Sequence, residues 1–157
     1  MHDDDYFLAR AIELASRGSE NGEGGPFGAV IVRDSKIIAE GWNRVIANHD
    51  PTAHAEINAI RAACSETGHF HLTGCTLYAS SEPCPMCLSA AYWARIERIV
   101  FANSRAEAAA IGFCDDRLYD ELSRHFSARS ILMEHRPLFG ALEPMRQWAA
   151  NPQHVGY

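Results

Sequence analysis

The chain has 157 residues, 47% of them hydrophobic, and a formal net charge of −6 from 14 basic and 20 acidic side chains. That length predicts one domain, spanning residues 1–157, with a core large enough to fold without disulfide staples. The negative balance and the single lysine, Lys36, argue against a nucleic acid as the partner, because such partners usually require a basic surface.

The first elements follow from hydrophobic periodicity. Residues 4–18 place apolar side chains at helical spacing, and Gly18 could end that helix. Residues 27–41 read as two strands around an Arg-Asp-Ser-Lys turn, which predicts a β-hairpin. A second helix is predicted over residues 50–64, with Pro51 at its start.

The rest of the chain continues this alternation. Further strands are predicted at 75–80, 98–103 and 130–134, and further helices at 83–95, 105–111 and 141–150. The prolines that open the third helix are tolerated there, because first-turn N–H groups have no helical partner. The order of elements predicts an α/β protein with a mixed five-stranded sheet and helices on both faces.

Cys84 and Cys87 stand in a Cys-Pro-Met-Cys motif at the start of the third predicted helix. Such a pair can be a redox dithiol, half of a structural zinc site or part of a catalytic metal site. A structural zinc would need a fourth protein ligand, for which Cys64, Cys75, Cys114 and the remaining histidines are the candidates.

A His-Ala-Glu motif, residues 54–56, supplies the other donor types. Imidazole and two thiolates are good zinc ligands, and helix N-termini favour the thiolate form of cysteine. His54 and Glu56 lie about 200° apart on a regular helix, so they can share a cavity only if they lie at its first turn.

Three protein ligands, His54, Cys84 and Cys87, leave a fourth position for water, which characterises a catalytic zinc. The ion lowers the pKa of that water, and Glu56 could carry its protons. His-x-Glu followed by Pro-Cys-x-x-Cys is the signature of zinc deaminases that act on nucleobases. A non-catalytic, zinc-stabilised binding protein is the alternative from another class, and it predicts a fourth protein ligand and no ammonia release.

The cellular compartment is expected to be the cytoplasm. The chain starts with an acidic segment that lacks the pattern of a secretion signal, and no apolar run approaches the roughly 18 residues of a membrane span. The five cysteines are an odd number, which argues against a fully paired disulfide framework. We therefore expect reduced thiols and no membrane partner.

With these motifs in view, the chain resembles the cytidine deaminase superfamily and, more narrowly, its small bacterial guanine deaminases. The segments that carry the resemblance are GGPFGAVIV, NHDPTAHAE, EPCPMCL, YWAR and GFCDD, at residues 24–32, 48–56, 82–88, 92–95 and 112–116. The resemblance implies a three-layer α/β/α fold, one Zn²⁺ held by His54, Cys84 and Cys87, and Glu56 as the proton shuttle.

The same resemblance implies the substrate contacts. They are Asn43 for the base, Phe27 and Trp93 for the pocket walls, a backbone contact from Ala55, and Asp115 for departure of the amino group, with Asp116 as a competitor for that role. The family also implies a homodimer in which the C-terminal segment is exchanged and Tyr157 closes the partner's site. The implied reaction of purine metabolism is hydrolysis of guanine to xanthine and ammonia; guanosine, cytosine and adenosine in tRNA are the alternative substrates.

Overall fold

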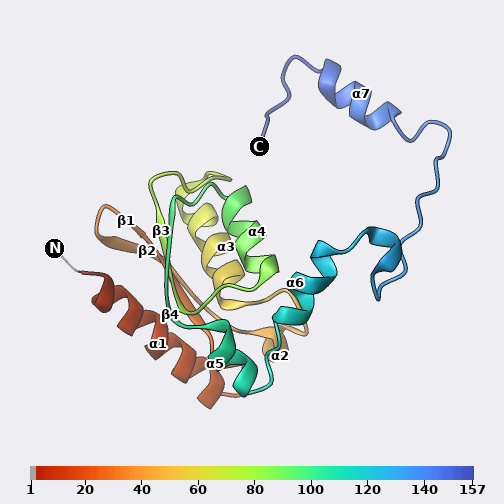
Figure 1. Ribbon diagram of the computed structural model, residues 1–157. Helices are drawn as coiled ribbons and strands as arrows, with labels where there is room; N and C mark the ends of the chain where they lie inside the picture. The colour runs from red at the N-terminus through yellow and green to blue at the C-terminus, as the bar shows by residue number, and fades with distance from the viewer. Residues whose placement is uncertain (1–2) are drawn as a thin grey trace. The chain divides into compact units, whose positions relative to one another are not determined.

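The computed structural model describes residues 3–157, which form two compact units. The first ends at Asp116, and the second is Arg117–Tyr157. A mixed sheet with the strand order β2-β1-β3-β4 forms the centre of the first unit (Figure 1). Its strands are β1 (Gly28–Arg33), β2 (Lys36–Trp42), β3 (Thr76–Ser81) and β4 (Arg98–Asn103). β1 is antiparallel to both β2 and β3, whereas β3 and β4 are parallel.

Helices flank this sheet on both faces. Those that begin in the first unit are α1 (Asp4–Glu20), α2 (Val45–Asn48), α3 (Ala55–Thr67), α4 (Pro85–Trp93), α5 (Arg105–Ala110) and α6 (Asp116–Ser123). The second unit holds the rest of α6, a short 3₁₀ helix (Phe126–Ala128) and α7 (Glu143–Ala150). α1 lies on one side of the sheet, and α3 and α4 lie on the other (Figure 1). The predicted three-layer α/β/α arrangement is therefore confirmed.

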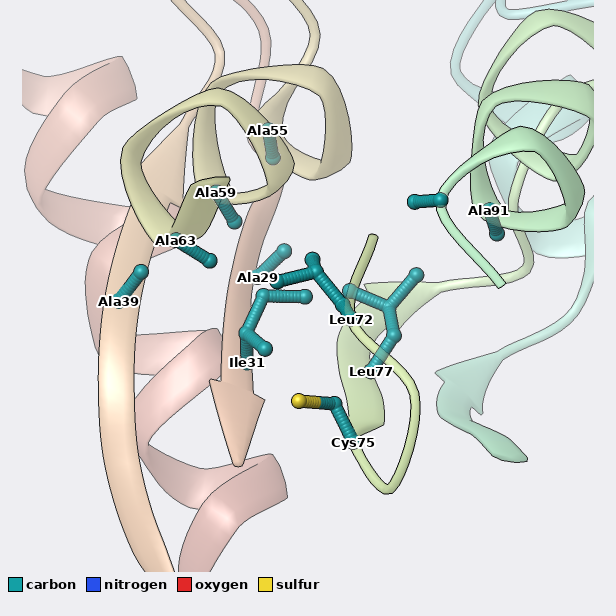
Figure 2. Packing of buried hydrophobic residues seen from close by; sticks show 11 residues of the cluster. Ala29, Ile31, Ala39, Ala55, Ala59, Ala63, Leu72, Cys75, Leu77 and Ala91 are labelled. Atoms are coloured by element: carbon teal, nitrogen blue, oxygen red, sulfur yellow. The ribbon is translucent and has the colours of Figure 1, made fainter. Parts of the chain in front are cut away.

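Alternation along β1 separates the core into two clusters. Val30 and Val32 pack with Phe7 and Leu14 of α1. The intervening Ile31 packs on the opposite face, in the cluster that includes the alanines of α3 (Figure 2). Successive strand residues point to opposite faces, so a strand buried on both sides carries the continuous apolar run seen here.

Small residues bring α3 close to the sheet. Ala55, Ala59 and Ala63 face the strands with almost no exposed surface (Figure 2). On β2, a Cβ atom added to Gly41 would lie 2.3 Å from the Ala55 carbonyl oxygen and 2.5 Å from the Ala59 amide nitrogen. The glycine therefore permits the first turn of α3 to pack closely against β2.

The prediction of a fifth strand at 130–134 is wrong. The sheet has four strands among the described residues, and the segment from 130 to 134 forms none. Ile131 and Leu132 are 76% and 83% exposed. The segment has the composition of a strand, but a strand also needs a hydrogen-bonding neighbour, and composition does not supply one.

The other predicted elements form, with shifted boundaries. The second predicted helix begins at Ala55 instead of residue 50, and the last one begins at Glu143 instead of residue 141. α6 was not predicted. Within residues 3–157, no helix combines the length and the apolar character needed to cross a bilayer.

Candidate active site

The loop before α3 sets the direction of His54. The Asp50 carboxylate accepts hydrogen bonds from the Thr52 amide at 2.8 Å and the Thr52 hydroxyl at 2.7 Å, which stabilises a turn instead of a helix. His54 is consequently the N-cap of α3, with extended backbone angles (φ −68°, ψ 159°). The regular 200° separation does not apply to a residue outside the helix, so His54 and Glu56 can both line one pocket.

The start of α4 presents the two thiols. Cys84 is the N-cap, with φ −66° and ψ 168°, and Pro85 opens the helix. Cys87 lies in the first turn and is completely buried, and Cys84 is 6% exposed. Both sulfur-bearing residues pack against Ile57 of α3, so an apolar contact holds the two helix starts together.

The three donors have the spacing that a tetrahedral zinc ion requires. His54 Nδ1 lies 3.6 Å from Cys84 Sγ and 3.5 Å from Cys87 Sγ. Zn–N and Zn–S bonds of about 2.0–2.1 and 2.3 Å at a tetrahedral angle place nitrogen and sulfur about 3.6 Å apart. The donor set and its geometry therefore fit zinc.

The hydrogen bond between the two sulfurs shifts their pKa values in opposite directions. The hydrogen bond from Cys87 lowers the pKa of Cys84 to about 4, and the same bond raises the pKa of Cys87 far above its usual range. The pair thus holds a single negative charge by itself. A divalent cation removes this conflict, because it stabilises both sulfurs as thiolates.

The cluster contains three protein donors. Among the described residues 3–157, no fourth histidine, cysteine or carboxylate joins the group. Cys64, Cys75 and Cys114 are free thiols outside it. The structural zinc site with four protein ligands is therefore not found in this part of the chain.

Glu56 is a buried carboxylic acid beside the donor cluster. It is 7% exposed, and burial raises its pKa to about 7. Hydrogen bonding to Cys84 is the main cause of the raised pKa of the neighbouring His54. A carboxyl group beside three metal donors is positioned to exchange protons with whatever binds in the pocket.

The remaining pocket wall comes from four separate segments. Besides His54, Glu56 and Cys84, the lining residues are Phe27, Asn43, Glu82, Phe113 and Asp115. Phe27 and Phe113 meet edge to face, with ring centroids 4.7 Å apart. The pocket therefore combines an aromatic pair, an amide and carboxyl groups around the donor cluster, which suits a flat polar ring.

The geometry separates Asp115 from Asp116. Asp115 lines the pocket, and burial raises its pKa, with the Cys84 thiolate as the next cause. Asp116 begins α6 and pairs instead with Arg105, its Oδ1 lying 3.5 Å from Nη1, while 76% of its side chain is exposed. Only the first of the two acids faces the candidate site.

Three of the expected substrate residues are not among the pocket-lining side chains. Trp93, at the end of α4, is 64% exposed. Ala55 is fully buried at the start of α3, where only its backbone N–H could serve a ligand. Tyr157 belongs to the second unit.

Two pocket residues were missed by sequence reasoning. Glu82 lines the pocket and is held by Arg105, whose backbone N–H donates to Oε2 at 3.0 Å and whose Nε lies 3.1 Å from Oε1. Its position directly before the Pro-Cys motif was an available signal. Phe113 had a weaker signal: it lies in the GFCDD segment that carries the family resemblance, and its contact with Phe27 identifies it as a wall of the site.

An α/β/α fold with three metal donors at two helix N-termini and a buried glutamate defines a zinc-dependent hydrolytic site of the deaminase class. The sequence model of the family described as the cytidine and deoxycytidylate deaminase zinc-binding region matches residues 1–103 of this chain. The chain belongs to this family of zinc-dependent deaminases, hydrolases that act on carbon–nitrogen bonds of cyclic amidines.

Individual relatives extend the similarity beyond that region. A guanine deaminase of Bacillus subtilis (strain 168) is 49% identical over 142 residues, which cover 90% of this chain and 91% of the relative. The X-ray structure of guanine deaminase from Bacillus subtilis superposes with a TM-score of 0.97 at 45% identity and covers 99% of both chains. A tRNA-specific adenosine deaminase of Haemophilus influenzae is 44% identical and covers 72% of this chain and 68% of the relative.

Proposed function

We propose that this protein is a guanine deaminase, which converts guanine and water into xanthine and ammonia. The observation that carries the proposal is one pocket in which His54, Cys84 and Cys87 meet the buried Glu56. Similarity to the guanine deaminase of Bacillus subtilis over nearly the whole chain supports guanine over other bases.

The site residues divide the chemistry between a cofactor and two acids. His54, Cys84 and Cys87 would hold Zn²⁺, which would supply an activated water at neutral pH by lowering the pKa of that water. Glu56 accepts a proton from the attacking water and donates a proton to the ring nitrogen beside C2, which makes C2 electrophilic. Once the water oxygen is bonded to C2, Glu56 takes the second proton from that oxygen and donates it to the amino group. The C2–N bond then breaks as the C2 carbonyl forms, and Asp115 assists the departure of ammonia.

The base is recognised by the other side of the pocket. Asn43 offers a hydrogen-bonding amide, and Phe27 offers an aromatic ring against which a purine can pack. Trp93 lies outside the pocket lining, and its proposed contact with the base rests on the family resemblance alone. Ala55 contributes a first-turn backbone N–H. These contacts fix which ring atom faces Glu56.

The native assembly is proposed to be a homodimer in which the C-terminal segment covers a partner. All residues of Arg117–Tyr157 are described, and none of them is buried. The exposed apolar side chains there include Leu138, Phe139, Leu142, Met145 and Trp148. An apolar surface of this kind favours burial against another chain, and Tyr157 at its end would reach the partner's base pocket.

The cytoplasm is the proposed location, because Cys84 and Cys87 can bind zinc only while they remain reduced. The substrate is proposed to be a free nucleobase. A net charge of −6 disfavours tRNA, although the tRNA-specific relatives make it the rival to exclude.

A substrate panel tests the function. Zinc-loaded protein is incubated with guanine, guanosine, cytosine, adenine, cytidine and an adenosine-containing tRNA anticodon stem, and ammonia release and ultraviolet spectra are followed. We expect turnover of guanine with formation of xanthine. Turnover confined to another substrate would replace guanine, and absence of ammonia with all of them would contradict a deaminase.

A further inference from the structure

The side-chain oxygen of Asn43 is already occupied by the protein. The backbone N–H groups of Gly25 and Val45 both donate to Oδ1, each at 3.2 Å. A backbone N–H can only donate, so the atom between them must be the oxygen. Within the described residues no protein acceptor binds the Asn43 Nδ2 group, although Asn43 is 4% exposed and lines the pocket. The NH₂ end is therefore the part of this amide that a ligand can reach.

One carboxylate links the residues on either side of Asn43. Glu23 Oε2 accepts a hydrogen bond from Trp42 Nε1 at 3.0 Å and lies 2.9 Å from Arg44 Nε. The Glu23 backbone oxygen also accepts from the Ala47 N–H at 3.0 Å. Glu23 thus ties the loop that contains Gly25 to the end of β2 and to α2.

The loop lies directly against the amide. A Cβ atom on Gly24 would lie 2.1 Å from Asn43 Oδ1 and 2.7 Å from the Asn43 carbonyl oxygen. The backbone of Gly24 therefore lies so close to Asn43 that the side-chain amide has no room to shift toward the loop. The position of the loop and the orientation of Asn43 are therefore coupled.

We propose that Glu23 is a positioning residue for base recognition, which holds Asn43 so that its NH₂ group faces the substrate as a hydrogen-bond donor. The proposal rests on the proposed deaminase function and adds a rule for substrate choice. The base must present an acceptor, a ring nitrogen or a carbonyl oxygen, to Asn43. A base that presents an N–H group at that point would place its donor against the donor of Asn43, with no acceptor between them, and is therefore rejected.

The test is a double-mutant cycle. The variants are Glu23→Ala, Asn43→Ala and the double variant, with Glu23→Gln as the conservative change. Glu20→Gln, which removes one charge from the exposed end of α1, is the matched control. For guanine turnover we expect Glu23→Ala to raise KM about tenfold with little change in kcat, because it loosens a substrate contact. Glu23→Gln retains an acceptor for Trp42 and should recover part of the loss.

Additivity decides between positioning and general stability. If Glu23 acts through Asn43, adding Glu23→Ala to Asn43→Ala should change KM less than about twofold. Losses that multiply would overturn the proposal, as would an unchanged KM in Glu23→Ala. Melting temperature and zinc content are measured for every variant, because a protein that has merely lost its fold or metal would lose kcat as well.

A binding measurement separates this proposal from the function. The affinity of each zinc-loaded variant for 8-azaguanine, a guanine analogue, is measured by calorimetry, and the same non-additive pattern is expected in Kd. A wild-type protein that binds the analogue with this pattern but releases no ammonia would contradict the deaminase function alone. Turnover with multiplicative losses would contradict the Glu23 role alone, and a wild-type protein that neither binds nor reacts would contradict both.

Discussion

Gly41 of β2 lies directly under Ala55, the first residue of α3: a Cβ on the glycine would stand 2.3 Å from the Ala55 carbonyl oxygen. The obstructing atom is backbone and cannot rotate away. His54 and Glu56 flank Ala55. The packing of Gly41 against Ala55 therefore determines how far these two site residues lie from the sheet.

Gly41→Ala is therefore expected to affect both stability and the metal site. Overpacking of this kind costs about 1–3 kcal/mol, because α3 must move away from the sheet. Thermal unfolding and zinc content measured together would show a lower melting temperature and reduced zinc occupancy. Gly156→Ala is the control, since a Cβ there meets nothing within 4 Å. Full zinc occupancy in Gly41→Ala would show that α3 tolerates the shift without moving its ligand.

Asp4 gives the fold a pH-dependent contact between α1 and the sheet. Tyr78 donates to Asp4 Oδ1 at 2.7 Å and Arg98 Nη1 donates to the same oxygen at 2.9 Å. The hydrogen bond from Arg98 is the main cause that lowers the Asp4 pKa from 3.8 to about 2. A depressed carboxyl pKa stabilises the fold above pH 4, and that contribution disappears as the pH falls toward 2.

Asp4→Asn should accordingly be less stable than wild type at pH 7, and the difference should shrink between pH 4 and pH 2. Urea unfolding at several pH values checks this. Asp5→Asn removes an equal charge from the same first turn of α1 and serves as the comparison. A difference that is independent of pH would exclude the ionised carboxylate as its source. Added salt should weaken the effect, because the ion pair is partly exposed.

Loss of one thiolate tests the metal site without reference to activity. Cys87→Ser replaces a fully buried sulfur whose distance from His54 Nδ1 is 3.5 Å. Changes to groups that merely support a metal ligand cost about 10–100-fold in affinity, so loss of a ligand should cost more than that. Zinc content after dialysis against a chelator should fall to near zero. Cys114→Ser, at an exposed thiol outside the cluster, should retain zinc, and equal retention by both variants would contradict the ligand assignment.

The metal donors could be predicted from sequence because local rules determine their environment. His54 and Cys84 are N-caps, and Pro85 after Cys84 marks that helix start in the sequence itself. The Asp50–Thr52 turn explains why α3 begins at Ala55, and a reading of helical periodicity alone placed that start too early. Local chemistry thus gave the correct donors but not the correct helix boundary.

Features that depend on contacts between distant segments do not follow from local sequence rules. Phe113 becomes a pocket wall only because it meets Phe27, and Glu82 is held in place by Arg105 from a later helix. The segment from 130 to 134 failed as a strand for the same reason, since pairing depends on a neighbour and not on composition. The orientation of the Asn43 amide also follows from tertiary contacts, with Gly25 on one side and Val45 on the other.

Removal of the carboxylate tests the proton shuttle. Glu56→Gln keeps the size of the side chain but can no longer accept and donate the proton, so kcat should fall by about 10²–10⁴-fold or more. Zinc content should stay near wild type, because His54, Cys84 and Cys87 are untouched. Steady-state ammonia release and metal analysis of the same sample check both statements. Substantial remaining turnover would refute the role of Glu56.

An isosteric change at Asn43 tests the donor that faces the base. Asn43→Asp retains an oxygen for the Gly25 and Val45 N–H groups but places a second oxygen where the NH₂ group stood. A base that presents an acceptor then meets another acceptor, so we expect kcat/KM for guanine to fall about 10–100-fold, with a matching loss of 8-azaguanine affinity. The melting temperature is measured as well, because a further carboxyl group in a pocket that already holds Glu56, Glu82 and Asp115 costs stability even though the internal hydrogen bonds persist. If the aspartate variant binds the analogue as tightly as wild type, the base does not accept a hydrogen bond from residue 43, and recognition must come from another wall of the pocket.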